Sequence, residues 1–190
     1  MSAKNYSPKA TEILDVAETH MRKGGFDAIS FRDLATAVGV KSASVHYHFP
    51  AKTDLGQAVV ARYRERILEA LGDPSDNRTM AAKLKHLFSV YTAALEEGDS
   101  VCLCAQLGAE ARFLPQDVAA EVELFFSGIV GWTADVLSQE TTPAKANKLA
   151  AHIVGSLQGA MVLAVATGSN LHLKNTQNML ADFIESQVAG

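Results

Sequence analysis

The sequence has little cysteine and no long uninterrupted apolar run. Its two cysteines, Cys102 and Cys104, are too few to cross-link a fold of 190 residues, and their spacing is not the Cys-x-x-Cys of zinc or thioredoxin sites. The longest apolar run, Ala160 to Thr167, is far shorter than the ~20 residues that a membrane span needs. The N-terminal segment contains no apolar stretch that could act as a secretion signal. We therefore expect a reduced, cytoplasmic protein that does not cross a membrane.

Motifs for catalysis, cofactors and metals are also missing. The sequence has no Walker loop, no Gly-x-Ser-x-Gly elbow and no dinucleotide-binding fingerprint. None of the six histidines belongs to a His-x-x-x-His pair, and none follows a glutamate by three residues, so the usual helical metal patterns are absent. An enzyme therefore has little support, and we predict no catalytic residue, no metal site and no cofactor.

The charge is distributed unevenly along the chain. The net charge is −4, but residues 1–66 carry ten basic and seven acidic side chains, whereas residues 67–190 carry seven basic and fourteen acidic ones. The first segment therefore has a net charge of +3 and the second a net charge of −7. A basic end on an acidic body favours a polyanionic partner that binds at one end only.

Apolar residues recur at helical spacing through nearly the whole chain, and no segment favours a strand. The sequence predicts an all-α fold of about nine helices, with Ser30 and Thr142 as N-caps and a break at Gly98–Ser100. The predicted helices cover residues 7–23, 31–38, 42–47, 52–71, 79–96, 101–113, 115–136, 143–167 and a last segment ending near 187. We expect two domains, an N-terminal helix-turn-helix domain at 1–52 and a larger helical domain at 53–190.

The segment between the second and third predicted helices has the pattern of a helix-turn-helix. Gly39 permits a sharp turn, and the short helix after it is able to enter a DNA major groove about 12 Å wide. Its polar residues would reach base edges or phosphates, and Ala43 is short enough to contact a thymine methyl group. Side chains at the end of this helix, with the first amides of the next one, would hold phosphates. The predicted DNA-binding residues are Arg32, Lys41, Ser42, Ala43, Ser44, His46, Tyr47, His48, Lys52 and Thr53.

Residues 30–55 resemble the signature of TetR-family regulators. The resemblance rests on Phe31, Leu34-Ala35, Gly39-Val40, Tyr47-His48-Phe49, Lys52 and Leu55, preceded by Gly24-Gly25-Phe26. It implies a homodimeric repressor that reads palindromic double-stranded DNA, with phosphates held by Tyr47, His48 and Lys52. His46 stands where the family commonly has an aromatic residue, which leaves open whether this side chain reads a base or packs. A packing motif without DNA binding, or a helical adaptor for another protein, is the alternative.

The second half of the chain is predicted to bind a small, mostly hydrophobic effector. Its helices carry apolar side chains with a few polar groups among them, including Glu110, although each aromatic taken singly is expected to fill the core. The predicted effector-binding residues are Tyr91, Cys102, Cys104, Gln106, Phe125, Phe126, Ile129, Trp132, Gln158 and Met161. A sharper hypothesis comes from Cys102 and Cys104, because the segment resembles that of family members that respond to electrophiles. A thiolate near a helix N-terminus is more reactive, although Asp99 would oppose this effect, and two buried, inert thiols are the alternative.

The last two predicted helices are expected to form the dimer. Small residues make a smooth surface on which helices approach closely, although tight packing within the chain would use the same pattern. The predicted dimer residues are Ala151, Gly155, Gly159, Leu180 and Phe183. In the expected mechanism, the effector favours a conformation in which the two helix-turn-helix heads have the wrong spacing for DNA, and the helix at 52–71 acts as the lever.

Overall fold

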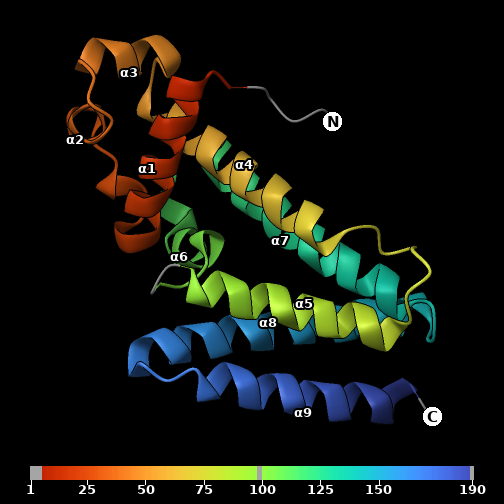
Figure 1. Ribbon diagram of the computed structural model, residues 1–190. Helices are drawn as coiled ribbons and strands as arrows, with labels where there is room; N and C mark the ends of the chain where they lie inside the picture. The colour runs from red at the N-terminus through yellow and green to blue at the C-terminus, as the bar shows by residue number, and fades with distance from the viewer. Residues whose placement is uncertain (1–5, 98–99, 189–190) are drawn as a thin grey trace. The chain divides into compact units, whose positions relative to one another are not determined.

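The computed structural model describes residues 6–97 and 100–188, and within them the chain forms nine α-helices, two short 3-10 helices and no strand (Figure 1). The predicted all-α fold is therefore confirmed. The helices are α1 (Pro8–Gly24), α2 (Phe31–Ala37), α3 (Ser42–His48), α4 (Lys52–Leu71), α5 (Met80–Glu96), α6 (Leu103–Ala109), α7 (Gln116–Leu137), α8 (Pro143–Thr167) and α9 (Leu171–Val188), with 3-10 turns at Phe26–Ala28 and Ala111–Phe113.

The helix starts follow local capping chemistry. The hydroxyl of Ser7 accepts a hydrogen bond from the backbone N–H of the third residue after it, and Ser30, Thr79 and Thr142 do the same at the starts of α2, α5 and α8. Each hydroxyl satisfies one of the N–H groups that a helix leaves without an internal partner. These interactions involve residues three positions apart, which is why sequence alone located the starts.

The helix predicted over 101–113 is shorter than expected. Cys102 has extended backbone and caps α6, because its Sγ accepts a hydrogen bond from Ala105 N at 3.3 Å. The helix ends at Ala109, and a separate 3-10 turn follows. Gly98 and Asp99, which the sequence analysis placed in a break before this helix, lie outside the described residues.

The described chain divides into two compact units. Unit 1 contains residues 6–66 and Cys102–Phe125, and unit 2 contains the remaining described residues, so α4 and α7 each contribute to both. The helix-turn-helix elements therefore share a compact unit with α6 and the start of α7. The functional boundary predicted after residue 52 is a different division, and it stays a prediction.

In unit 1, α1 is the central support for α2 and α3. Its buried stripe includes Ile13, Leu14 and Met21, each 0% exposed. At the edge of this stripe, Glu18 is 7% exposed and binds Arg66 of α4 through two hydrogen bonds, of 2.6 Å and 3.2 Å. A paired carboxylate with two donors offsets the desolvation of its charge, so this contact specifies how α4 packs on α1.

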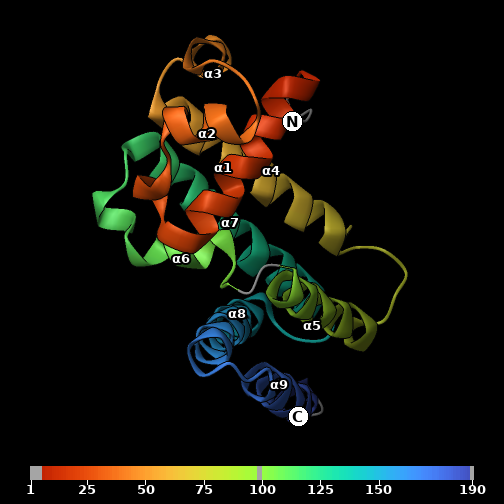
Figure 2. The same ribbon diagram turned by 60° about the vertical axis from the view of Figure 1, so that its left-hand side comes forward.

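In unit 2, α8 lies beside both α5 and α9 (Figures 1 and 2). Within the described part of the chain, α8 is the one helix long and apolar enough to cross a membrane by length and composition. The sequence analysis had counted only uninterrupted apolar runs, and α8 reaches this hydropathy as an average over a longer window. Ile153, Leu157 and Met161 of α8 are 0% exposed, as expected of a helix in a protein core.

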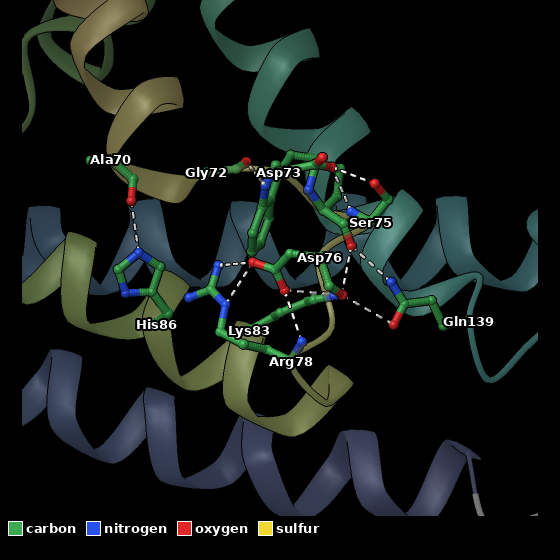
Figure 3. Close-up of polar contacts among 11 residues, drawn as sticks. Ala70, Gly72, Asp73, Ser75, Asp76, Arg78, Lys83, His86 and Gln139 are labelled. Atoms are coloured by element: carbon green, nitrogen blue, oxygen red, sulfur yellow. Dashed lines mark hydrogen bonds and ion pairs between the residues drawn. The ribbon is translucent and has the colours of Figure 1, made fainter.

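A buried lysine organises the loop between α4 and α5 (Figure 3). Lys83 is 0% exposed, and its Nζ donates to Pro74 O at 2.7 Å and to Asp76 O at 2.8 Å. Gln139, which follows α7, donates to the same Pro74 O at 2.8 Å. The ammonium therefore binds two backbone carbonyls of the loop and ties the loop to α5.

We predict that Lys83→Met lowers the free energy of unfolding by ~1.5–3 kcal/mol, because Asp76 O loses a charged donor while the apolar stem is kept. Urea denaturation followed by circular dichroism measures this change. The matched control is Lys85→Met, an exposed lysine of the same helix, which should change stability by less than ~0.5 kcal/mol. Equal effects of the two substitutions would contradict a structural role for the Lys83 ammonium.

Candidate nucleic-acid interface

The turn between α2 and α3 depends on Gly39. Its φ is +68°, a left-handed conformation that other residues adopt only with strain. The turn is closed by hydrogen bonds from Gly39 N to Thr36 O (3.3 Å) and from Val40 N to Ala35 O (2.9 Å). The structure thus gives Gly39 the role expected from the sequence, and α3 leaves this turn at an angle to α2 (Figure 2).

Helix α3 is attached to unit 1 by one side only. Val45 is the single buried residue of the helix and is 0% exposed, and Phe49 just after it is 4% exposed. Tyr47, by contrast, is 83% exposed. The exposed predicted DNA-binding residues of this region are Arg32, Lys41, Ser42, Ala43, His46 and Tyr47, and the half-buried ones are Ser44, His48, Lys52 and Thr53. The structure therefore places none of these ten residues in the interior of unit 1.

His46 both packs and remains exposed. Its ring centroid lies 4.6 Å from that of Phe31 on α2, with the ring planes tilted by 59°. Its Nδ1 lies 3.4 Å from Pro50 O, in the turn that follows α3. Phe31 is half-buried, and the neighbour that packs on its ring is this exposed histidine.

The start of α4 adds a lysine and a capping carboxylate. Lys52 Nζ lies 3.3 Å from Asp27 O and 3.5 Å from Asp27 Oδ1, and it sits over the Phe26 ring at 4.8 Å from the centroid. Asp54 Oδ2 accepts a hydrogen bond from Ala51 N at 2.9 Å. The sequence analysis missed Asp27, which partly neutralises Lys52, since nothing in the local pattern brings residues this far apart together.

An open hollow of about 810 Å³ lies within unit 1 at the end of α3. Tyr47 and His48 border it, and Tyr6, Asp54 and Glu65 also line it. Tyr47 and His48 contact each other edge to face, with ring centroids 5.2 Å apart. The carboxylates of Asp54 and Glu65 give this hollow a negative character. A phosphate is therefore better accommodated on the outer side of α3 than in the hollow.

Glu110 has a different role from the one expected. It was predicted as a polar group of the effector cavity, but its Oε1 accepts a hydrogen bond from Phe26 N at 3.0 Å. The carboxylate occupies the space beside Gly25, where an added Cβ would lie 2.2 Å from Oε1. Glu110 caps the end of α6, so this bond fastens α6 to the segment between α1 and α2. The two residues that form this hydrogen bond are 84 positions apart in the chain, and no feature of the sequence predicted it.

The predicted effector residues fall in both compact units. Cys102, Cys104, Gln106 and Phe125 belong to unit 1, and Tyr91, Phe126, Ile129, Trp132, Gln158 and Met161 belong to unit 2. Several of them are engaged within their own unit: Gln158 Nε2 donates to the Tyr91 hydroxyl at 3.1 Å, and Trp132 Nε1 donates to Gly72 O at 2.8 Å. A separate groove of about 630 Å³ between α5 and α9 is lined by none of the predicted residues. The effector site stays a prediction.

The two thiols are buried. Cys102 is 3% and Cys104 is 0% exposed, and burial raises the pKa of the Cys104 thiol well above its usual range. Burial also raises the pKa of the neighbouring Tyr63 hydroxyl. A low dielectric disfavours the thiolate, which is the nucleophilic form of cysteine.

The predicted dimer residues divide into surface and core. Ala151, Gly155 and Gly159 on α8 are exposed, and Phe183 on α9 is 37% exposed. Leu180 is only 4% exposed within the single chain, so it packs mainly inside unit 2, and the dimer interface stays a prediction. The neighbouring Met179 is 73% exposed and is the residue that the sequence analysis overlooked on this surface.

The comparisons with known proteins agree with this architecture. Residues 13–59 match the family model "Bacterial regulatory proteins, tetR family". The HTH-type transcriptional repressor KstR2 of Rhodococcus jostii (strain RHA1) is 32% identical over 73 residues, a match that spans 34% of this chain and only 36% of that repressor.

Solved structures cover nearly the whole chain. A TetR transcriptional regulator from Legionella pneumophila is 31% identical, with a TM-score of 0.86 over 97% of this chain and 100% of that one. A TetR-family regulator from Agrobacterium tumefaciens is 27% identical, with a TM-score of 0.83 over 92% of this chain and 96% of that one. Identity at this level over the full length, together with the exposed helix-turn-helix, shows that the chain belongs to the TetR family of DNA-binding transcriptional regulators.

Proposed function

We propose that this regulator is a homodimeric, cytoplasmic repressor that binds a palindromic operator and is released by a small hydrophobic effector. The observation that carries the proposal is the outward face of α3, which presents polar and small side chains beside the largely exposed Tyr47. A short helix held from one side by Val45 and Phe49 has its other side free to enter a major groove.

Within this interface, the contacts fall into two classes. Lys41, Ser42, Ala43 and His46 lie toward the part of α3 that would face base edges. Tyr47, His48, Lys52 and Thr53 lie at the end of α3 and the start of α4, where a hydroxyl, an imidazole and an ammonium would hold the phosphate backbone. Because Asp27 already binds Lys52, we expect this lysine to contribute less than an unpaired one.

We predict that Tyr47→Ala weakens binding to every duplex by the same factor, roughly tenfold for a dimer that loses two phosphate contacts. Since tyrosine is uncharged, the dependence of affinity on salt should stay as in the wild type, whereas Lys52→Ala should reduce it. Fluorescence anisotropy with specific and random duplexes over a salt series measures both quantities. Lys174→Ala, on α9, is the control. Unchanged DNA affinity in both interface variants would refute the assignment.

The exposed glycines of α8 support the proposal that a second subunit packs on this helix. A Cβ added at Gly155 or Gly159 would meet nothing within 4 Å in the single chain, so packing within the protomer does not require glycine at either position. Exposed apolar side chains lie on the same helix and on α9, including Val162 (50%), Leu163 (52%) and Met179 (73%). A second copy that packs closely on α8 and α9 would bury these side chains and would need the glycines for close approach.

We predict that the double substitution Gly155→Gln, Gly159→Gln dissociates the dimer and leaves the protomer folded. The added side chains occupy space that is empty in the single chain but would be filled by a partner helix. Sedimentation equilibrium measures the mass, and circular dichroism measures helix content. Gly131→Gln on α7, where a Cβ also meets nothing within 4 Å, is the matched control and should leave the mass unchanged. A double variant with the wild-type mass would place the interface elsewhere.

The effector is better described as hydrophobic than as electrophilic. The burial of Cys102 and Cys104 disfavours a thiolate that an electrophile could reach. A route for the response is offered by Glu110, which binds α6 to Phe26 N in the helix-turn-helix unit. An effector that shifts α6 would shift this carboxylate, and with it the segment that leads into α2. The ratio of the effector's affinities for the shifted and the DNA-binding conformation would set how much DNA affinity is lost.

We predict that the native protein reacts with Ellman's reagent roughly 100-fold or more slowly than the urea-unfolded protein, because both thiols must first become accessible through local opening. We also expect a thiol-reactive compound to leave the protein–DNA complex intact on the time scale of minutes. Absorbance at the thionitrobenzoate band and a gel shift measure the two effects. Rapid release of DNA by the compound, abolished by Cys102→Ser with Cys104→Ser, would instead establish the electrophile hypothesis.

A further inference from the structure

The two ring nitrogens of His46 differ in their surroundings, because one contacts a backbone carbonyl and the other does not. Nδ1 lies 3.4 Å from Pro50 O, and the Phe31 ring packs on the imidazole at a centroid distance of 4.6 Å. For Nε2, the described residues provide no hydrogen-bond partner. The ring is thus held between α2 and the turn after α3, although the residue itself is exposed.

The partner of Nδ1 determines which tautomer the neutral ring adopts. A carbonyl oxygen only accepts hydrogen bonds, so we assign the hydrogen of the neutral ring to Nδ1, which then donates to Pro50 O. Neutral imidazole has a single N–H, which leaves Nε2 as a lone-pair acceptor. His46 therefore differs from a tyrosine at this position, whose hydroxyl would both donate and accept.

The place of His46 on α3 directs this acceptor to the interface. His46 follows Ser42 and Ala43 by four and three residues, so the three share one face of the helix, and all are exposed. In a major groove, the hydrogen-bond donors of the bases are the N6 amino group of adenine and the N4 amino group of cytosine. Guanine and thymine present acceptors there, which would face the lone pair of Nε2 with repulsion.

We propose that His46 is a specificity-determining residue whose Nε2 accepts, in each half-site, a hydrogen bond from one exocyclic amino group, that of adenine or that of cytosine. The inference rests on the proposed function, because it requires that α3 enters the major groove. It goes further by assigning one side-chain atom to one class of base atom, and it is particular to this chain, where histidine replaces the usual aromatic residue.

The test begins with selection of binding sites from a library of random duplexes, using the full-length wild type, His46→Ala and His46→Leu. The leucine variant keeps an apolar side chain against Phe31, so loss of packing and loss of the acceptor are separated. We expect the wild type to enrich one base pair at one position of each half-site, with the adenine or cytosine of that pair as the selected base. Both variants should lose this preference while keeping the rest of the site. His48→Ala is the matched control, another histidine of α3, and should weaken all sequences without altering the base preference.

The second step removes the base donor instead of the protein acceptor. Where the selected base is adenine, it is replaced by purine, which lacks the amino group; where it is cytosine, by 2-pyrimidinone. We expect wild-type affinity to fall about 3- to 10-fold per half-site, as for one lost hydrogen bond, and the affinity of His46→Ala to be unaffected. Identical site preferences in the wild type and His46→Ala, or an equal loss of affinity in both proteins when the amino group is removed, would overturn the inference alone. Enrichment of no duplex by any form of the protein would overturn the proposed function together with it.

Discussion

A helix of seven residues does not hold itself together in water, because its few internal hydrogen bonds do not offset the cost of forming the first turn. Helix α3 therefore depends on the burial of Val45 and Phe49 against its neighbours and on the left-handed turn at Gly39. This one-sided anchorage has a functional consequence. The residues that would contact DNA contribute little to the core, so they are free to vary for recognition while Val45 keeps the helix in place.

Polar contacts between distant segments then fix the surroundings of α3. Asp27 holds Lys52 at the start of α4, Glu18 binds Arg66 further along that helix, and Glu110 binds Phe26 N. The first two contacts join α4 to the α1–α2 region, and the third joins the end of α6 to it. Unit 1 is thus more than a helix-turn-helix, because α6 and the start of α7 share its core and its polar contacts. The proposed response to an effector uses this arrangement, in which a displacement of α6 acts directly on the support of α2.

The sequence predicted most of the fold because the helices begin and end with local chemistry. Ser30 and Thr142 cap their helices through residues three positions away, and α4 has the predicted bounds. The error at 101–113 has a related cause, since a thiol that caps a helix was taken for a residue inside one. Leu180, predicted at the dimer interface, is buried within the single chain, and the sequence did not signal this because an apolar residue on a helix stripe has the same pattern whether it faces its own core or a partner.

By itself, the sequence determined the all-helical class, the turn at Gly39 and the row of polar residues along 41–48, since these depend on residues within about one helical turn of each other. The tertiary structure decided what each of those residues is able to do. It packs His46 against Phe31 and close to Pro50 O, it pairs Lys52 with Asp27, and it binds Glu110, expected in a cavity, to the backbone of Phe26. The physical reason is that hydrogen-bond partners and burial depend on which segments meet in space, and segments tens of residues apart carry no local signal of that meeting.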